Sequence, residues 1–135
     1  MKSRDALIRL KHFEVEEKRR KVADIEVMIS DFNHMAVDLD RQIAIEQERA
    51  GVSDINHYAY PTFAKAALQR RNNLAASAAN LEAKLASGRE HLEEACEELK
   101  KIELLEERDE RARLEQAHST QELDPLTAGV HRVAS

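Results

Sequence analysis

Three pairs of residues place a carboxylate three positions before a histidine, a spacing that puts both side chains on one face of a helix and could serve a metal ion. The pairs are Asp31 with His34, Asp54 with His57, and Glu115 with His118. A carboxylate-bridged metal pair needs two such motifs facing each other across a four-helix core, with two further glutamates. The three pairs fall on separate segments of a chain with 26 acids and six histidines. We therefore interpret them as solvated surface and predict no metal and no cofactor.

Other catalytic patterns are missing from the sequence. It has no glycine-rich phosphate loop, no His-Glu-x-x-His motif and no Cys-x-x-Cys pair. The single cysteine, Cys96, excludes an internal disulfide, and the glutamates around it disfavour its thiolate. Charged residues interrupt the start of the chain, and no run of about 18 apolar residues occurs. We predict a cytoplasmic protein that is not an enzyme and does not insert into a membrane.

The basic run from Lys18 to Lys21 could contact nucleic acid. Glu14, Glu16 and Glu17 adjoin it, no aromatic platform accompanies it, and the formal net charge of the chain is -5. The sequence therefore predicts no binding to nucleic acid. The run is interpreted as a solvated face or an internal partner for the glutamates, and contact with an acidic protein is the alternative.

Aromatic residues give a sharper signal, because three of the five lie close together as Tyr58, Tyr60 and Phe63. Exposed aromatic rings often anchor protein partners. The same rings could instead plug the end of a helical hairpin against Leu39, Ile43 and Ile45. Both interpretations stay open from the sequence, and both can hold at once.

The elements that carry these residues follow a heptad rhythm. Charged residues make up 35% of the chain and aromatic ones 4%, with three glycines and two prolines, which is typical of long or supercoiled helices. Apolar residues spaced alternately by three and four predict a coiled-coil seam in two runs. The first run is Ile8, Lys11, Val15, Lys18, Val22, Ile25, Ile29, Phe32, Ala36, Leu39 and Ile43. The second is Ala64, Ala67, Arg71, Leu74, Ala78, Leu81, Leu85, Gly88, Leu92, Ala95, Leu99 and Ile102.

The break between the runs and the distribution of charge predict an antiparallel hairpin. Gly51 can close the first helix, and Pro61 suits the start of the second. Residues 1–21 carry eight basic residues against four acids, a net charge of +4, and residues 82–125 carry seven against fourteen, a net charge of -7. Folding back near Ile55 brings these opposite charges together, and an isolated hairpin of this kind is expected to be monomeric.

We therefore predict an all-α fold of two long helices in an antiparallel coiled-coil hairpin. Helix one covers about residues 3–49, the tip about 50–61 and helix two about 62–122. These form a single domain over residues 1–124, followed by a flexible tail at 125–135.

Two stretches of the sequence resemble a known family. The opening Met-Lys-Ser-Arg-Asp-Ala-Leu-Ile-Arg-Leu-Lys and the stretch from Tyr58 to Arg71 are similar to the flagellar export protein FliJ in its alphaproteobacterial form, and the likeness covers roughly residues 1–115. The resemblance implies a hairpin similar to the gamma-subunit stalk of rotary ATPases. It implies as partners the hexameric export ATPase FliI, the cytoplasmic domain of the export gate FlhA, and export chaperones. The location that it implies is the cytoplasmic face of the inner membrane, reached through the export apparatus.

The resemblance also assigns residues to the two partners. The end that faces the ATPase ring would comprise Arg4, Leu7, Arg9, Lys11, Leu104, Leu105 and Arg108. The tip that binds the gate would comprise Leu39, Tyr58, Tyr60 and Phe63. This sequence departs from better-known members on helix one of the tip, where it carries Ile45 and Arg49 in place of aromatic residues.

Two other functions fit the sequence. The stalk of a virulence type III injectisome would share the hairpin and the ring but serve different cargo. A homodimeric coiled-coil scaffold, in which each helix pairs with a second chain, belongs to another class and would show a dimeric mass in solution.

Overall fold

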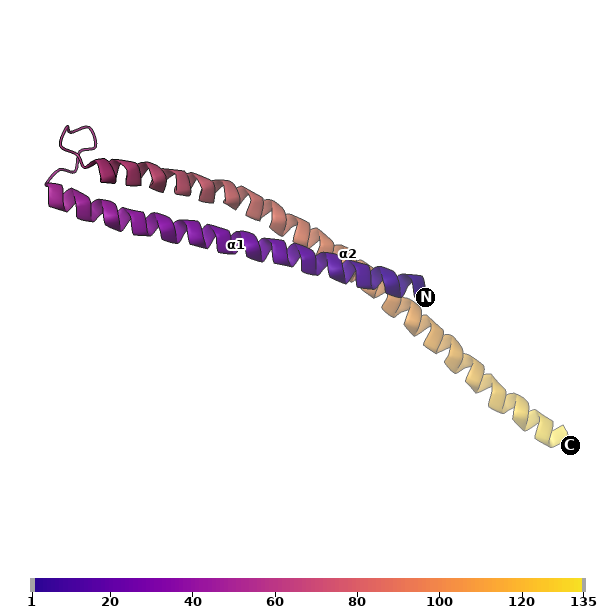
Figure 1. Ribbon diagram of the computed structural model, residues 1–135. Coiled ribbons are helices and arrows are strands. Elements are labelled where there is room, and N and C mark those ends of the chain that lie inside the picture. The colour runs from indigo at the N-terminus through magenta and orange to yellow at the C-terminus, as the bar shows by residue number, and fades with distance from the viewer. Residues whose placement is uncertain (1, 135) are drawn as a thin grey trace. The chain divides into compact units, whose positions relative to one another are not determined.

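The computed structural model describes the backbone of residues 2–134 and the side chains of residues 4–120. The chain is an all-α helical hairpin, in which α1 (Lys2–Ala50) and α2 (Thr62–Ala134) are joined by residues 51–61 (Figure 1). No strand occurs among the residues with a described backbone. The two-helix fold that the heptad pattern predicts is confirmed, and the helix ends at the tip lie within one residue of the predicted positions.

The hairpin divides into two compact units. The tip unit is Glu16–Glu93, and the end unit combines Met1–Val15 with Glu94–Ser135. Each unit pairs one stretch of α1 with one stretch of α2. The sequence predicted a single domain over residues 1–124. Two units arise because each layer of a two-helix coiled coil contacts only its neighbouring layers, so no central core ties the whole hairpin together.

The end of α2 differs from the prediction. We expected the helix to stop near Glu122, ahead of Pro125, but the helical backbone continues to Ala134. A proline inside a helix removes one backbone hydrogen bond and crowds the preceding turn, yet long helices accommodate it with a kink. The side chains of residues 121–135 lie outside the described part of the chain. The predicted flexible tail at residues 125–135 falls in this segment and stays a prediction.

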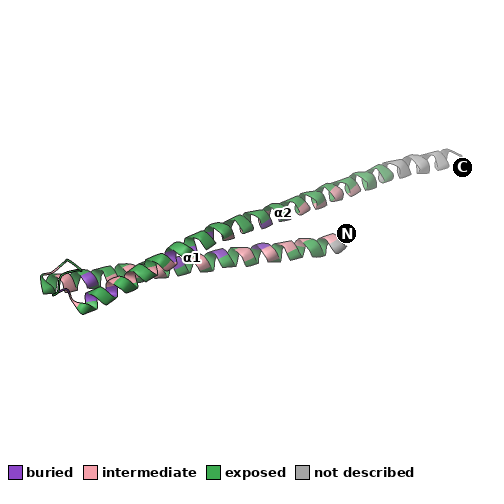
Figure 2. Cartoon of the chain, turned by 90° about the horizontal axis from the view of Figure 1, so that it is seen from above, coloured by how far each residue is buried: buried purple, intermediate pink, exposed green. Residues whose placement is uncertain are grey.

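The faces of α1 and α2 that meet are the predicted seam. All 23 seam positions named above are buried or half-buried. Among residues 4–120, eleven of the twelve buried apolar residues belong to the seam, and the twelfth is Tyr60. Figure 2 shows the buried residues following the facing sides of the two helices. The core of the tip unit is the cluster of Val22, Ile29, Leu81 and Leu85, against which Ile25, Phe32 and Leu92 pack.

The register of the hairpin matches the predicted turn near Ile55. In the tip unit, a Cβ built on Gly88 would lie 3.5 Å from a methyl group of Val22, and residue 55 is the midpoint between these two positions. In the end unit, Arg4 pairs with Glu106, whose midpoint is also residue 55. Large residues on α1 therefore meet small ones on α2, as at Val22 and Gly88.

Gly88 gives a first testable prediction. It lies inside α2, where glycine destabilises a helix by roughly 0.5–1 kcal/mol relative to alanine. The added methyl group would make an ordinary contact with Val22 at 3.5 Å. We therefore expect Gly88→Ala to raise the free energy of unfolding by about 0.5–1 kcal/mol, measured by urea denaturation followed by circular dichroism.

The matched control is the same exchange at Gly51. Gly51 has φ of 69°, and its N–H donates to the carbonyl of Gln47 (2.9 Å) to close α1. A Cβ there meets no atom within 4 Å, so only the left-handed backbone penalises it. Gly51→Ala should lower the free energy of unfolding by roughly 1–2 kcal/mol. A shift of the same sign in both variants would contradict the assigned roles of the two glycines.

Candidate partner-binding surfaces

The tip loop is held by a short series of local hydrogen bonds. The backbone N–H of Asn56 donates to Oδ1 of Asp54 (2.9 Å), and the N–H of His57 donates to the Asp54 carbonyl (3.0 Å). The N–H of Ala59 donates to Nδ1 of His57 (3.0 Å), and that of Tyr60 to the His57 carbonyl (3.0 Å). Asp54 and His57, which were considered as a metal pair, therefore organise successive turns of the loop.

Tyr60 is buried at the tip, with 8% of its surface exposed. Its hydroxyl accepts a hydrogen bond from Nε2 of Gln47 on α1 (2.9 Å). This ring supports the interpretation as a plug, since it fills the end of the hairpin and ties the loop back to α1. Tyr60 was also assigned to the gate-binding set. Its buried position makes it a support for that surface and leaves little of it to touch a partner.

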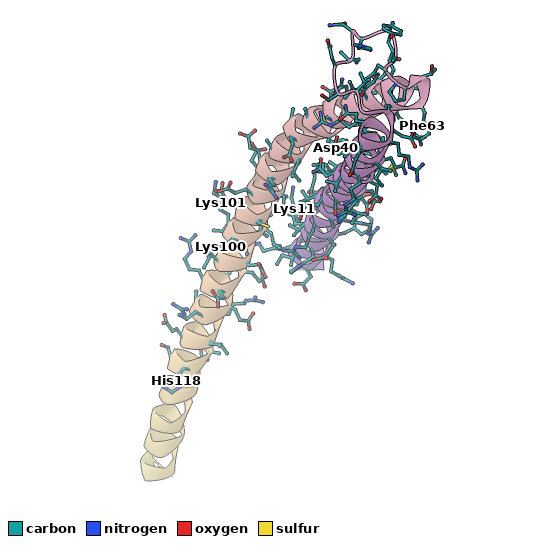
Figure 3. The ribbon with its side chains drawn as sticks, turned by 90° about the vertical axis from the view of Figure 1, so that its left-hand side faces the viewer. Lys11, Asp40, Phe63, Lys100, Lys101 and His118 are labelled. Atoms are coloured by element: carbon teal, nitrogen blue, oxygen red, sulfur yellow. The ribbon has the colours of Figure 1, made fainter. Side chains whose placement is uncertain are left out.

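Tyr58 and Phe63 are the exposed aromatic residues of the tip, and we call them the tip surface. Tyr58 is 96% exposed and stacks on the ring of His57, with ring centroids 4.6 Å apart. Phe63, in the first turn of α2, is 56% exposed (Figure 3). Leu39, the fourth residue assigned to the tip, is half-buried in the seam. The three tip rings therefore split into one plug and two exposed rings.

In the end unit the seam changes from apolar to charged. The alternation of three and four continues beyond Ile102 to Glu106, Asp109 and Arg113, which are all half-buried. Arg4, four residues before Ile8 and so the preceding position of the same alternation, forms ion pairs with Glu106 (3.3 Å) and with Asp109. Sequence reasoning missed this charged layer because it began the seam at Ile8 and ended it at Ile102, the outermost apolar positions of the two runs.

Lys11 also lies on the seam, and its Nζ contacts Glu98 at 3.0 Å and Glu14 at 3.4 Å. The hydrogen bond that Lys11 donates to Glu98, helped by the one it donates to Glu14, raises the pKa of Lys11, and the hydrogen bond that Arg4 donates to Asp109 raises the pKa of Arg4. The predicted meeting of a basic α1 start with acidic α2 is thus observed. The resemblance assigns Arg4 and Lys11 to a surface facing the ATPase ring. In the structure both cations form ion pairs with acids of α2.

The pairing of Asp109 predicts a pH dependence. The hydrogen bond from Arg4 lowers the pKa of Asp109 from its ordinary 3.8. A lowered folded-state pKa stabilises the folded state above pH 3.8, and the contribution disappears as the pH falls through the lowered value. We expect Asp109→Asn to be less stable than the wild type at neutral pH, with the difference in thermal midpoint closing below about pH 3.8. A difference that is constant down to pH 2 would contradict this pairing.

The remaining residues of the predicted ring-facing set are exposed. Leu104, Leu105 and Arg108 line a shallow hollow on α2 together with Lys101, and we call these four residues the end surface. Leu104 is 53% and Leu105 42% exposed. Lys101 is labelled in Figure 3. The end surface thus combines two leucines with two cations, which suits a partner with apolar and acidic groups.

Leu7 and Arg9, on α1 of the same unit, are also exposed. Leu7 begins a row with Leu10 and Phe13, spaced by three residues and exposed at 40%, 51% and 61%. The sequence reasoning named Leu7 but not Leu10 or Phe13. The sequence did contain a signal for Leu10 and Phe13, since neither is a seam position. A large apolar residue off the seam of a two-helix coiled coil has no partner helix and is therefore expected to be exposed.

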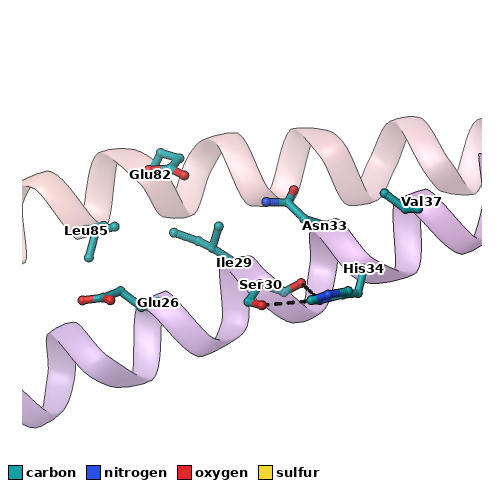
Figure 4. Close-up of a pocket in the computed structure, with 8 residues that line it drawn as sticks. All are labelled: Glu26, Ile29, Ser30, Asn33, His34, Val37, Glu82 and Leu85. Atoms are coloured by element: carbon teal, nitrogen blue, oxygen red, sulfur yellow. Dashed lines mark hydrogen bonds between the residues drawn. The ribbon is translucent and has the colours of Figure 1, made fainter.

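A second shallow hollow lies beside the seam of the tip unit (Figure 4). It is lined by Glu26, Ile29, Ser30, Asn33, His34, Val37, Glu82 and Leu85. The Nδ1–H of His34 donates to the carbonyl of Ser30 (2.8 Å), so this imidazole is bonded to its own helix. Asp31, the acid three residues before it, takes no part in the lining. The Asp31–His34 pair is therefore not assembled in this hollow.

Among the described residues no group of three or more His, Cys, Asp or Glu side chains could hold a metal ion. Cys96 is a half-buried free thiol. No helix in the described part of the chain has an apolar stretch long enough to cross a bilayer. Comparison of the chain with family models, with curated proteins and with solved structures finds no match.

Proposed function

We propose that this chain is a non-catalytic stalk of a flagellar type III export apparatus, linking a hexameric export ATPase to the cytoplasmic domain of the export gate. One observation carries the proposal. The seam residues of α1 and α2 bury one another, and the hairpin still exposes the aromatic tip surface and the end surface. Tyr58 and Phe63 belong to the tip unit, and Leu104, Leu105 and Arg108 to the end unit. Two such surfaces suit two different partners.

The resemblance of the chain start and of the tip sequence to FliJ supplies the identity of the partners. In this proposal the end surface binds the ATPase ring and the tip surface binds the gate. Arg4 and Lys11 act indirectly by holding the start of α1 against α2, and Tyr60 acts by fixing the tip loop. Escort of export chaperones and attachment to the inner membrane through the gate belong to the same proposal.

Transmission between two partners requires no bond-making chemistry. A stalk couples a ring to a gate when different states of the ring bind it with different affinity, by about 1–3 kcal/mol in typical coupled systems. The stalk of a virulence injectisome would couple its ring and gate in the same way. The neighbouring genes distinguish a flagellar stalk from an injectisome stalk. A scaffold in which each helix pairs with another chain is disfavoured, because the seams of α1 and α2 are buried against each other.

The direct test is a binding experiment with purified partners. The hairpin is labelled at Cys96, and its binding to the export ATPase and to the gate domain of the same bacterium is measured separately. The proposal expects saturable binding to each, with both partners held at once by a single hairpin. Binding to neither protein, together with binding to the corresponding injectisome proteins, would assign the stalk to that system. Binding to none of the four would overturn the proposal.

The end surface gives a prediction of its own. Leu104→Glu combined with Leu105→Glu places two acids in the hollow between Lys101 and Arg108. Because both leucines are exposed, helicity should be unchanged, while affinity for the ATPase should fall roughly tenfold. Leu114→Glu, at a leucine of α2 that is 63% exposed and outside the hollow, is the control and should bind normally. Equal loss in both variants would contradict the end surface.

A further inference from the structure

The tip unit has an apolar flank that the hairpin does not use. With Val22, Ile29, Ala36 and Ile43 as heptad positions a, and Ile25, Phe32 and Leu39 as positions d, the seam of α1 has flanks at positions e and g. In two-stranded coiled coils both flanks usually carry charges that pair between the helices. On α1 the two flanks differ from each other.

The e flank follows the usual pattern. Glu26 lies 3.9 Å from Arg89 of α2, which is also an e position, and Asp40 lies 3.0 Å from Arg71. Asp40 is labelled in Figure 3. The e rows of the two helices therefore meet on one side of the seam and carry its ion pairs.

The g flank of α1 is apolar and open in its middle part, between Lys21 and Gln42, which are also g positions. Its positions include Met28 and Met35, which are 45% and 46% exposed. Together with half-buried Phe32 and Leu39 they form a continuous stripe at intervals of four, three and four residues. We call these four residues the methionine stripe. Methionine is flexible and polarizable, and it suits surfaces that receive another apolar side chain.

A row of carboxylates borders the methionine stripe on the outer side. Asp24, Asp31 and Asp38 recur at intervals of seven, and all three are exposed. Asp24 and Asp31 each precede a stripe methionine by four residues and so lie directly beside it. Asp38 contacts Arg41 of its own helix at 3.4 Å, and among the described residues neither Asp24 nor Asp31 has a cationic partner. Asp24 and Asp31 therefore make no ion pair within the described part of the hairpin.

The other border belongs to α2. Because the e rows meet on one side of the seam, the g rows meet on the other side, and the g row of α2 includes Arg70 and Lys84. Both residues are exposed, and neither has a described acidic partner. The methionine stripe is therefore bordered by acids on α1 and by bases on α2, and its period is that of a coiled coil.

We propose that the methionine stripe binds a third helix supplied by a protein partner, an amphipathic heptad helix with basic residues along one edge of its apolar face and acidic residues along the other. The basic edge lies against Asp24, Asp31 and Asp38, and the acidic edge against Arg70 and Lys84. This polarity allows one orientation of the third helix, because reversing it would place like charges together. The site goes beyond the two surfaces of the stalk proposal and requires neither of them.

The test uses a labelled three-heptad peptide with leucine at a and d, lysine at e and glutamate at g, at a concentration where it is monomeric. Its fluorescence anisotropy is followed on titration with the full chain at low salt. The expected result is saturable binding. A peptide of the same length with glutamate at both e and g should bind at least about tenfold more weakly, because it meets the aspartate row with like charge.

Variants of the chain separate the stripe from the rest of α1. Met28→Gln with Met35→Gln keeps length, charge and helix propensity, and it should weaken binding about tenfold or more by removing apolar contact. The control is Val27→Gln with Val37→Gln, two exposed residues (58% and 46%) off the g flank, which should bind as the wild type does. Asp24→Asn with Asp31→Asn should weaken binding and reduce its salt dependence.

Three results would overturn the proposal. The first is the absence of saturable binding by the wild-type chain. The second is an equal loss of binding in the methionine and valine variants while circular dichroism shows intact helices. The third is a dimeric wild-type chain that Met28→Gln with Met35→Gln converts to a monomer, since a second copy of the chain would then be the occupant.

Discussion

Replacing Leu85 with alanine is expected to lower the free energy of unfolding by about 2–4 kcal/mol, the largest stability change foreseen for a single side chain here. Leu85 is 5% exposed in the cluster with Val22, Ile29 and Leu81. Truncation removes the contacts of the isobutyl group and leaves a space that the two helices fill only partly. In a hairpin that is two helices thick, no second layer of side chains can move in to compensate.

Leu104→Ala provides the matched comparison, with the same residue type on the same helix. Leu104 is 53% exposed, and its truncation should change stability by less than about 0.5 kcal/mol. Urea denaturation followed by circular dichroism measures both variants. If Leu85→Ala were as mild as Leu104→Ala, the seam drawn through Leu85 would be wrong.

Replacing Phe63 with alanine is expected to reduce affinity for the gate domain by roughly thirtyfold or more, the loss typical of an aromatic residue that anchors an interface. Phe63 is 56% exposed and lies outside the seam, so the helices should keep their stability. Isothermal titration calorimetry with the purified gate domain measures the affinity, and circular dichroism the fold.

Phe13→Ala is the control for this variant. Phe13 is the other strongly exposed phenylalanine (61%), and it belongs to the end unit. It should leave gate affinity within about twofold of the wild type. Normal gate binding by Phe63→Ala would remove Phe63 from the interface, and an equal loss in both variants would show that exposed apolar area alone drives the binding.

Much of the fold was predictable from local pattern. A seam repeats every seven residues, so its members can be recognised one turn at a time, and every predicted seam position is buried or half-buried. Arg71 interrupts the pattern as predicted, with its side chain 39% exposed and 3.0 Å from Asp40. The charge asymmetry of the two arms likewise predicted which ends would pair.

The candidate surfaces were harder to predict, because they depend on register and on the path of the loop. Arg4 pairs with Glu106, 102 positions away along the chain, and Lys11 pairs with Glu98, 87 positions away, so a one-heptad shift in register would have broken both pairs. The division of the tip rings into buried Tyr60 and exposed Tyr58 depends on hydrogen bonds around His57 that no periodicity encodes. Heptad counting also passed over the methionine stripe, because it treats one apolar stripe per helix as sufficient.

Because the layer around Arg4 is charged, ionic strength should change the local stability of the start of α1 more than that of the apolar seam. Dissolved ions screen the partly exposed pair of Arg4 with Glu106, whereas they leave the packing of Leu85 on Val22 intact or tighten it. Amide protons in the first turns of α1 should therefore exchange faster with solvent as salt is added, while those around Ile29 keep their protection. Added salt can thus weaken the ion pairs that hold the start of α1 against α2 without unfolding the apolar core of the tip unit.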